Sequence, residues 1–230
     1  MPSDPHEPAR LDDHPGDGVA RSTARMEAFA DAVFAIAFTL PVVEIEAPDL
    51  HNAGAGGLGA QLSLLWPSYL GYALAAAITG IYWVQHHFAG AIYRTVGHWF
   101  NLATVVFLAA IGFVAFPARL FAESLAEPQH LPTAARALTT FLAVTGACWL
   151  FKWTVGRKSG HVDARLDPAY VERLNRRYRL STALLIVGAL IGVVSWQVGL
   201  GIAGLVTLWY VRAPETPVYV RQAPTVEGET

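Results

Sequence analysis

The sequence has little of what characterises secreted or redox-active proteins, since its 230 residues include only one cysteine, Cys148. One thiol forms no disulfide framework, no paired redox site and no thiolate cluster for zinc. Charged residues make up 15% of the chain and the formal net charge is −2, so no basic field is present to attract nucleic acid. Glycine-rich phosphate loops and catalytic serine motifs are also missing. The sequence therefore gives no support for nucleic-acid partners, nucleotide chemistry or a disulfide scaffold.

Hydrophobic residues are abundant instead, at 53% of the chain, with a mean hydropathy of +0.37. This balance is typical of a chain embedded in a bilayer, where a spanning helix needs about 20 apolar residues. Six segments come near that length: residues 24–45, 62–89, 99–121, 137–155, 180–198 and 199–211. The sequence therefore predicts an all-α, polytopic membrane protein with six transmembrane helices.

Both ends of the chain differ in composition from the apolar middle. Residues 1–22 are rich in Pro, Asp and His and contain no apolar stretch, so they predict a disordered tail and no cleaved signal peptide. Residues 213–230 are polar and rich in proline, which also predicts a disordered tail. The expected organisation is a tail over 1–22, a transmembrane domain over 23–212 and a second tail over 213–230.

The basic residues are distributed asymmetrically across the six predicted spans. With both termini on one side, that side holds all of the 16 basic residues except Arg119 and Arg136. Basic flanks of spans stay in the cytoplasm. The pattern predicts a multi-pass protein of the plasma membrane with cytoplasmic N- and C-termini.

The longest basic link, residues 157–179, has apolar residues at intervals of four: Leu166, Tyr170, Leu174 and Tyr178. This spacing predicts an amphipathic helix lying in the membrane interface, with its arginines toward water. Its basic residues either bind anionic lipid head groups or only set the orientation of the chain.

The first predicted span carries ionisable residues that are costly at membrane depth, among them Arg25, Glu27 and Asp31. At 100° per residue, seven side chains fall along one narrow stripe. The stripe consists of Arg25, Phe29, Ala32, Ile36, Thr39, Leu40 and Val43. Asp31 points about 140° away from Ile36. The stripe predicts either the lining of an axial pathway or an ordinary helix-packing surface.

The residues of this span closely resemble the first-helix signature of the TMEM175-like potassium channel family, which is an Arg, three intervening residues and then Phe-Ser-Asp. Here Arg25 precedes Phe29, Ala30 and Asp31, so the family serine is replaced by Ala30. Further positions that resemble the family are Trp83, His86, His87, Asn101, Phe116 and Pro117. The resemblance covers most of the first 120 residues and beyond them rests on the number of spans.

The resemblance implies a single six-helix repeat that assembles as a homotetramer, with the first helices around a central pore. It implies that Ile36 forms the narrowest point and that Thr39 and Val43 line the pore further on; Leu40 lies on the same stripe. A ring of isoleucines is a hydrophobic constriction that gates by dewetting and discriminates weakly among monovalent cations. The expected function is a potassium channel, weakly selective over sodium, with lipids and potassium ions as partners and no cofactor.

Three acidic residues follow the first span, namely Glu44, Glu46 and Asp49, with no basic residue before Leu62. In four copies they would concentrate cations at an outer vestibule. The alternative is that they are solvated loop charges.

Polar residues near the cytoplasmic ends of the first three spans predict a structural network of Arg25, Asp31, Trp83, His87 and Asn101. A membrane metalloenzyme that uses His86, His87 and His98 is a weaker hypothesis, because adjacent histidines lie about 100° apart on a helix. A third hypothesis is a non-conducting scaffold or regulatory subunit. The Thr95-Val96-Gly97 sequence is similar to a carbonyl filter, but it lies in a short link with no preceding pore helix.

Overall fold

The computed structural model describes residues 23–48 and 57–220, and every named element within these ranges is helical. The elements are α1 (Ala24–Thr39), the 3-10 helix η1 (Leu40–Glu44), α2 (Gly57–Leu64), α3 (Trp66–Gly90), α4 (His98–Gly112), α5 (Ala115–Ser124), α6 (Leu131–Lys158), α7 (Pro168–Val194) and α8 (Trp196–Trp209). Extended pairing in these ranges is limited to two isolated bridges. The predicted all-α class is confirmed for the described residues.

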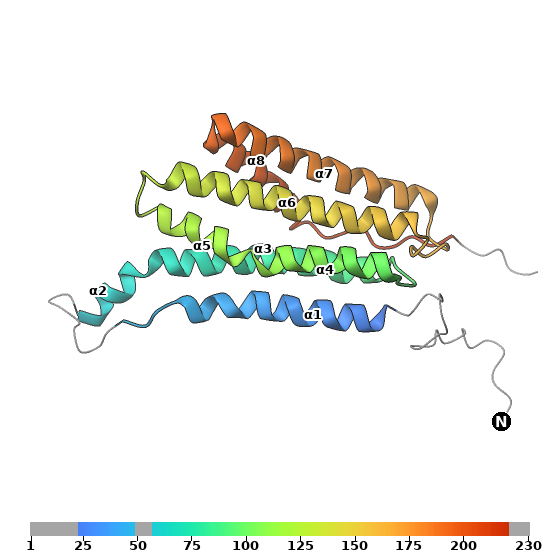
Figure 1. The fold of residues 1–230 in the computed structure, drawn as a ribbon, viewed down its shortest axis with the longest axis horizontal. Coiled ribbons are helices and arrows are strands. Elements are labelled where there is room, and N and C mark those ends of the chain that lie inside the picture. The colour runs from blue at the N-terminus through green and yellow to red at the C-terminus, as the bar shows by residue number, and fades with distance from the viewer. Residues whose placement is uncertain (1–22, 49–56, 221–230) are drawn as a thin grey trace, which may run out of the picture.

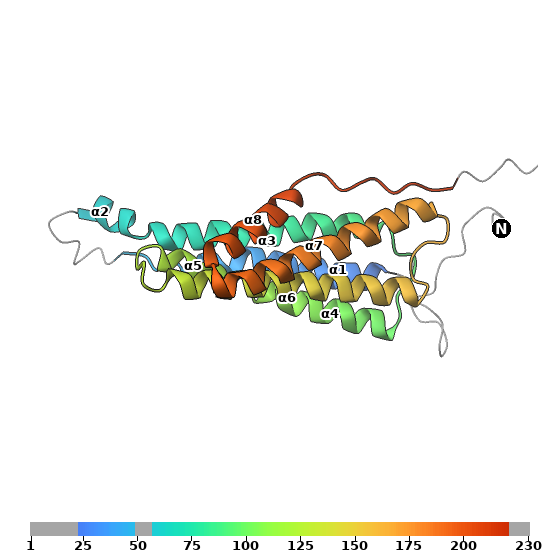
Figure 2. The same ribbon diagram turned by 90° about the horizontal axis from the view of Figure 1, so that it is seen from above.

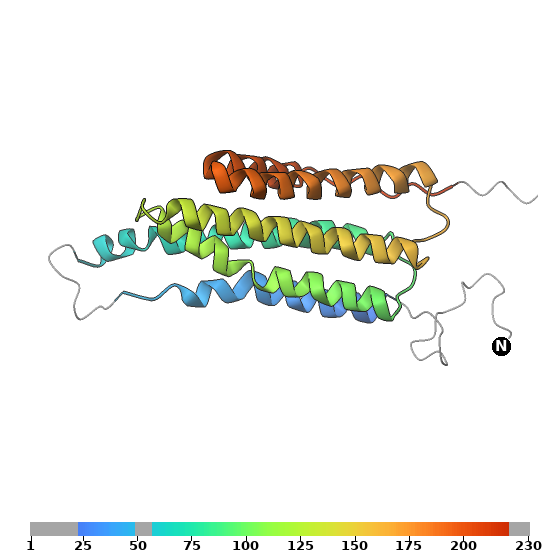
Figure 3. The same cartoon turned by 45° about the horizontal axis from the view of Figure 1, so that its top comes forward.

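The helices run along one long axis and form three layers (Figure 1, Figure 3). α1 and α4 make one outer layer, α3, α5 and α6 the middle one, and α7 and α8 the other outer layer. Figure 2 shows α2 extending past the bundle at one end. At the opposite end, called the loop end below, lie the start of α1, the 91–97 link and the 159–167 loop.

Four stretches among the described residues are long and apolar enough to cross a membrane: α1 with η1, α4 with α5, α6, and α7. α2 with α3 makes a fifth if this pair, bent by 44°, counts as one span. α8 has 14 residues and is shorter than the other candidates. By length and composition, at most five of the six predicted spans are therefore found, and the sixth stays a prediction.

Prolines account for the irregular points of these spans. Pro41 lacks the N–H that would continue α1, and the chain tightens into η1. Pro117 cannot donate to the carbonyl of Phe113, which instead accepts from the Phe116 N–H at 3.2 Å where α4 ends and α5 begins. Pro67 lies beside the bend between α2 and α3.

α7 begins at Pro168, well before the predicted start of the fifth span at 180, because Asp167 caps it by accepting from the Ala169 N–H at 2.8 Å. The prediction of an interfacial helix is wrong for this segment. Its apolar residues, Tyr170, Leu174 and Tyr178, are buried in the core of the bundle. The basic link is therefore largely an extension of a membrane helix whose apolar stripe faces the core of the chain.

α7 and α8 form a tight antiparallel hairpin that turns at Ser195, so α8 starts at Trp196 and not at the predicted 199. A Cβ atom built on Gly199 would lie 2.6 Å from the carbonyl oxygen of Gly188 and 2.6 Å from the Cα atom of Gly192. The three glycines thus allow the two backbones to approach each other closely.

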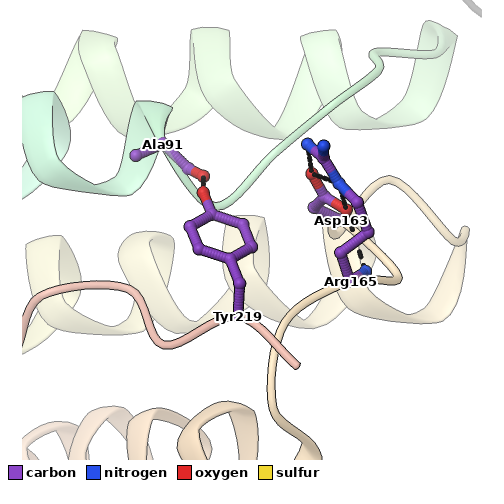
Figure 4. Close-up of polar contacts among 4 residues, drawn as sticks. All are labelled: Ala91, Asp163, Arg165 and Tyr219. Atoms are coloured by element: carbon purple, nitrogen blue, oxygen red, sulfur yellow. Dashed lines mark hydrogen bonds and ion pairs between the residues drawn. The ribbon is translucent and has the colours of Figure 1, made fainter. Parts of the chain in front are cut away.

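The C-terminal segment returns along the bundle to the loop end (Figure 1). Residues 213–220, the first part of the predicted tail, pair with the 159–167 loop: the Asp167 N–H donates to the Val218 carbonyl and the Val220 N–H to the Arg165 carbonyl, each at 2.8 Å. The Tyr219 hydroxyl donates to the Ala91 carbonyl at 3.2 Å (Figure 4). This segment therefore connects the end of α3 with the start of α7; residues 221–230 lie outside the described residues.

Beside Tyr219, Arg165 forms a two-pronged ion pair with the buried carboxylate of Asp163, with a shortest distance of 2.6 Å (Figure 4). The Arg165 guanidinium holds the pKa of the Asp163 carboxyl below its ordinary value. A lowered carboxyl pKa contributes stability at neutral pH that is lost as the pH falls through that lowered value.

We expect Asp163→Asn to lower the thermal unfolding midpoint at neutral pH, because the amide leaves Arg165 without its ion pair. The difference from the wild type should shrink as the pH falls below about 3.9, where ordinary aspartates become protonated. Thermal unfolding scans across this pH range measure both the lowered midpoint and its dependence on pH. Glu46→Gln, at an exposed glutamate, is the control. A pH-independent difference would contradict the role of the charge.

Candidate functional site

α1 packs against α3 and α4 through a narrow face of Ala30, Phe34 and Ala37, all of which are buried. The two alanines let the backbones approach, and Phe34 inserts its ring beside His86 of α3 at 5.5 Å and Phe107 of α4 at 6.2 Å. Ala30, where the family signature has serine, is fully buried and has no hydroxyl that would need a partner. One face of α1 is thereby fixed to α3 and α4.

The stripe predicted from the sequence lies on the remaining, uncovered surface of α1 and η1. Ile36 is 54% exposed, Leu40 56% and Val43 74%. Leu40 and Val43 belong to the 3-10 helix, which turns about 120° per residue and so shifts them relative to an α-helical stripe. The Thr39 hydroxyl donates to the Ala35 carbonyl at 2.8 Å, so its oxygen lone pairs stay open toward the exposed side. A largely aliphatic surface with one hydroxyl is thus left uncovered by the rest of the described chain.

Of the predicted polar network, three residues come together on the outer surface of α1 and α3. The Trp83 indole N–H donates to the Asp31 carboxylate at 3.1 Å, and the His87 ring stacks on Trp83 with centroids 5.6 Å apart. Within the described part of the chain, Arg25 has no hydrogen bond or ion pair, and the side-chain oxygen of Asn101 is buried without a partner. Among the described residues, this chain therefore assembles the Asp31, Trp83 and His87 part of the predicted network.

The acids after the first span differ in their surroundings. Glu44 forms an ion pair with Arg119 of α5 at 2.9 Å, and Arg119 also pairs with Glu123 at 2.6 Å. Glu46 is exposed, and Asp49 lies outside the described residues. Sequence reasoning missed the Glu44 to Arg119 contact, because a separation of 75 residues leaves no local pattern.

The histidines of the metalloenzyme hypothesis point into different surroundings. His86 is 3% exposed and lies among aromatic rings, whereas His87 stacks on Trp83 at the surface and His98 is exposed. No three His, Cys, Asp or Glu side chains gather as a metal centre would require in residues 23–48 and 57–220. This hypothesis therefore has no geometric support.

A cation that sequence reasoning counted only as a basic flank, Lys152, lies in the core at 2% exposure. Its ammonium nitrogen is 5.1 Å from the ring centroid of Trp149 and 5.6 Å from that of Phe107. The rings of Tyr93 and Phe100 lie at 5.9 and 6.0 Å. The only feature of the sequence that could have indicated the aromatic surroundings of Lys152 is the run of residues around it, from Trp149 to Trp153.

Comparison with known proteins shows which family this chain is similar to. The family model described as endosomal/lysosomal potassium channel TMEM175 matches residues 25–115. A potassium channel of Chamaesiphon minutus is 31% identical over 191 residues, which are 82% of this chain and 93% of that protein. A potassium channel of Streptomyces collinus is 29% identical over 202 residues, which are 87% of this chain and 97% of that protein.

A solved structure is similar to this chain both in fold and in sequence. The crystal structure of a lysosomal potassium-selective channel TMEM175 homolog from Chamaesiphon minutus superimposes with a TM-score of 0.68 at 29% identity, over 82% of this chain and 96% of that one. The matched region includes α1, with its exposed aliphatic surface, and the α3 residues beside it. From the signature of α1, the shared fold and these relatives, we conclude that this multi-pass membrane protein belongs to the TMEM175 family.

Proposed function

We propose that this protein is a potassium-conducting cation channel of the plasma membrane, assembled from four copies with α1 around a central pore. The observation that carries the proposal is the exposed aliphatic surface of α1 and η1, formed by Ile36, Leu40 and Val43. Such a surface on the helix with the family signature is suited to meet its own copies around an axis. The similarity to proteins named potassium channels supports potassium as the permeant ion.

In this proposal Ile36 forms the constriction, and Thr39, Leu40 and Val43 line the pore beyond it. Because aliphatic side chains offer no oxygen ligands, discrimination between potassium and sodium is weak and comes from the cost of removing water. Glu46 and Asp49 attract cations at the outer mouth, and Glu44 contributes less because Arg119 neutralises it. The proposed pore needs no cofactor. In the proposed topology the chain crosses the membrane six times, and both termini lie in the cytoplasm.

Efflux of potassium from proteoliposomes that contain the purified protein tests the proposal, together with the mass of the complex in detergent. A tetramer that releases potassium faster than empty vesicles is the expected result. A monomer, or a tetramer without flux in any ionic condition, would instead support the scaffold hypothesis.

Asp31→Ala is expected to reduce the yield of tetramer more than the conduction of the tetramers that form. Asp31 holds Trp83 on the outer surface of α1 and α3, away from the stripe that includes Ile36. Size-exclusion chromatography measures the yield, and flux per tetramer measures conduction. Thr207→Ala, in which the lost hydroxyl bonds only to its own helix, is the control. Normal assembly of the Asp31 variant would refute this role.

A further inference from the structure

A groove of about 750 Å³, called the α4–α6 groove below, runs between two helices that lie side by side in the bundle (Figure 3). Ala110 of α4 and Ala137 of α6 line it with short side chains, which leave the surface hollow between larger neighbours. Two of these neighbours, Val106 and Val144, are 43% and 50% exposed. The groove is therefore open at the outer surface of the bundle, where a membrane protein meets lipid.

The α4–α6 groove has one charged residue in the described part of the chain, Arg136 of α6, and no acidic side chain lines it there. The Arg136 Nε donates to the carbonyl oxygen of Gly192 at 2.9 Å, which fixes the guanidinium in place. Its two terminal nitrogens form no hydrogen bond or ion pair with residues 23–48 or 57–220. A guanidinium held by one nitrogen, with the other two free, is suited to pair with an oxyanion.

The length of α6 indicates how deep Arg136 lies in the membrane. With 28 residues the helix is about 42 Å long, so a centred helix extends about 6 Å beyond each side of a hydrocarbon core of about 30 Å. Arg136 lies about 7.5 Å from Leu131, where the helix starts. Its guanidinium therefore reaches the boundary between acyl chains and head groups, which is the depth of a phospholipid phosphate.

The apolar part of the groove has the length of a lipid chain. From Arg136 to Cys148, which also lines it, the groove follows α6 for about 18 Å. One leaflet of the hydrocarbon core is about 15 Å thick, so an acyl chain below a phosphate at Arg136 reaches Cys148. A soluble anion would use only the charged end, and an apolar helix from another protein would leave Arg136 without an anion. Both features together fit a lipid with a net negative charge.

We propose that the α4–α6 groove binds one anionic glycerophospholipid, with its phosphate on Arg136 and one acyl chain along α6 toward Cys148. The proposal requires only that the bundle spans a membrane, and it is independent of ion conduction. Arg136 also holds the Gly192 carbonyl in the last turn of α7. The bound lipid thus stabilises the packing of α4, α6 and α7 at the end of the bundle away from the loop end.

Native mass spectrometry of the purified full chain tests the role of the charge. The protein is titrated with phosphatidylglycerol or with phosphatidylcholine of the same acyl chains, and the wild type should bind phosphatidylglycerol more tightly. Arg136→Gln should weaken the binding of phosphatidylglycerol about tenfold and remove the preference, because a hydrogen-bonded charge pair is lost.

Arg119→Gln is the matched control, since it removes the same charge at the same end of the bundle. The Arg119 guanidinium already pairs with Glu44 and Glu123, so this variant should bind phosphatidylglycerol like the wild type. Equal losses in the Arg136 and Arg119 variants would indicate a general attraction to the surface charge and would overturn the site.

Val144→Trp tests the shape of the groove and leaves the bond between Arg136 and Gly192 in place. The indole should fill the path of the acyl chain and weaken the binding of phosphatidylglycerol about tenfold, even if Arg136→Gln fails to fold. Val187→Trp is the control, because Val187 is 45% exposed on α7 and does not line the groove. Wild-type binding by Val144→Trp would mean that the acyl chain lies elsewhere, and the proposal would fail.

Cys148 reports on the apolar end of the groove, because it is the only cysteine of the chain. Phosphatidylglycerol should slow the reaction of Cys148 with a maleimide in the wild type but not in Arg136→Gln. Glycerol phosphate, which has no acyl chains, should slow it in neither protein. Equal protection by glycerol phosphate would indicate a site for small anions only. Protection that follows the size of the oligomer and not the added lipid would mean that a second copy covers the groove. Either result would overturn the lipid site.

Discussion

Ile36→Asn should raise potassium efflux from proteoliposomes about tenfold, which corresponds to about 1.4 kcal/mol removed from the barrier to permeation. Ile36 is 54% exposed on the uncovered side of α1, and in the proposed tetramer four copies of it would form an apolar ring that excludes water. An asparagine amide both hydrates the ring and offers an oxygen to a dehydrated ion. The permeability ratio of potassium to sodium should fall at the same time, because discrimination by dehydration weakens.

Ile186→Asn is a matched control, since Ile186 is 42% exposed on α7, in the opposite outer layer of the bundle. This control should leave flux and selectivity unchanged. Stopped-flow measurement with a potassium-loaded vesicle and a potential-sensitive dye gives both quantities. If substitutions at Ile36, Thr39 and Val43 all leave potassium flux unchanged, the conduction pathway lies elsewhere in the protein.

The largest loss of stability is expected from Gly199→Ala. The new methyl group would meet the backbone of Gly188 and Gly192 at 2.6 Å, and backbone atoms within helices cannot move aside as a flexible side chain can. Overpacking of this kind costs about 1–3 kcal/mol or more, and the α7–α8 hairpin must open to relieve it. Thermal unfolding in detergent measures the loss.

Gly201→Ala, two residues further along α8, has nothing within 4 Å of its added Cβ and provides the control. Because alanine favours helix by about 0.8–1.0 kcal/mol over glycine, this control should be neutral or slightly stabilising. Equal stability of the two variants would mean that the hairpin packs less closely than the distances around Gly199 indicate.

The exposed stripe of α1 was predictable from the sequence because α1 is a regular helix up to Thr39. A constant angle per residue separates Ile36, on the exposed side, from Phe34 and Ala37, which are buried. From Leu40 onward the angle per residue changes, so the positions of Leu40 and Val43 follow from the 3-10 geometry and not from the α-helical period. Periodicity predicts a face only as far as its helix continues.

The features that sequence reasoning missed depend on contacts between distant segments. The start of α7 was read as an interfacial segment, since hydropathy alone cannot show whether Tyr170 and Leu174 face lipid or another helix; the Asp167-Pro168 cap was the overlooked local signal. Lys152 was counted as a cytoplasmic charge, because only the tertiary fold brings Tyr93, Phe100 and Phe107 around it. Pairing of Glu44 with Arg119 likewise requires α5 to lie beside η1.

The peripheral position of α1 has a consequence for ion leakage while the protein is inserted into the membrane and assembled. α1 touches its own subunit through one narrow face on α3 and α4, and its other side stays bare. If the pore forms only between four copies, as proposed, a newly inserted copy would be electrically silent. Leakage during biosynthesis would then be avoided by geometry alone, because the proposed conduit would first exist when the fourth copy closes the ring.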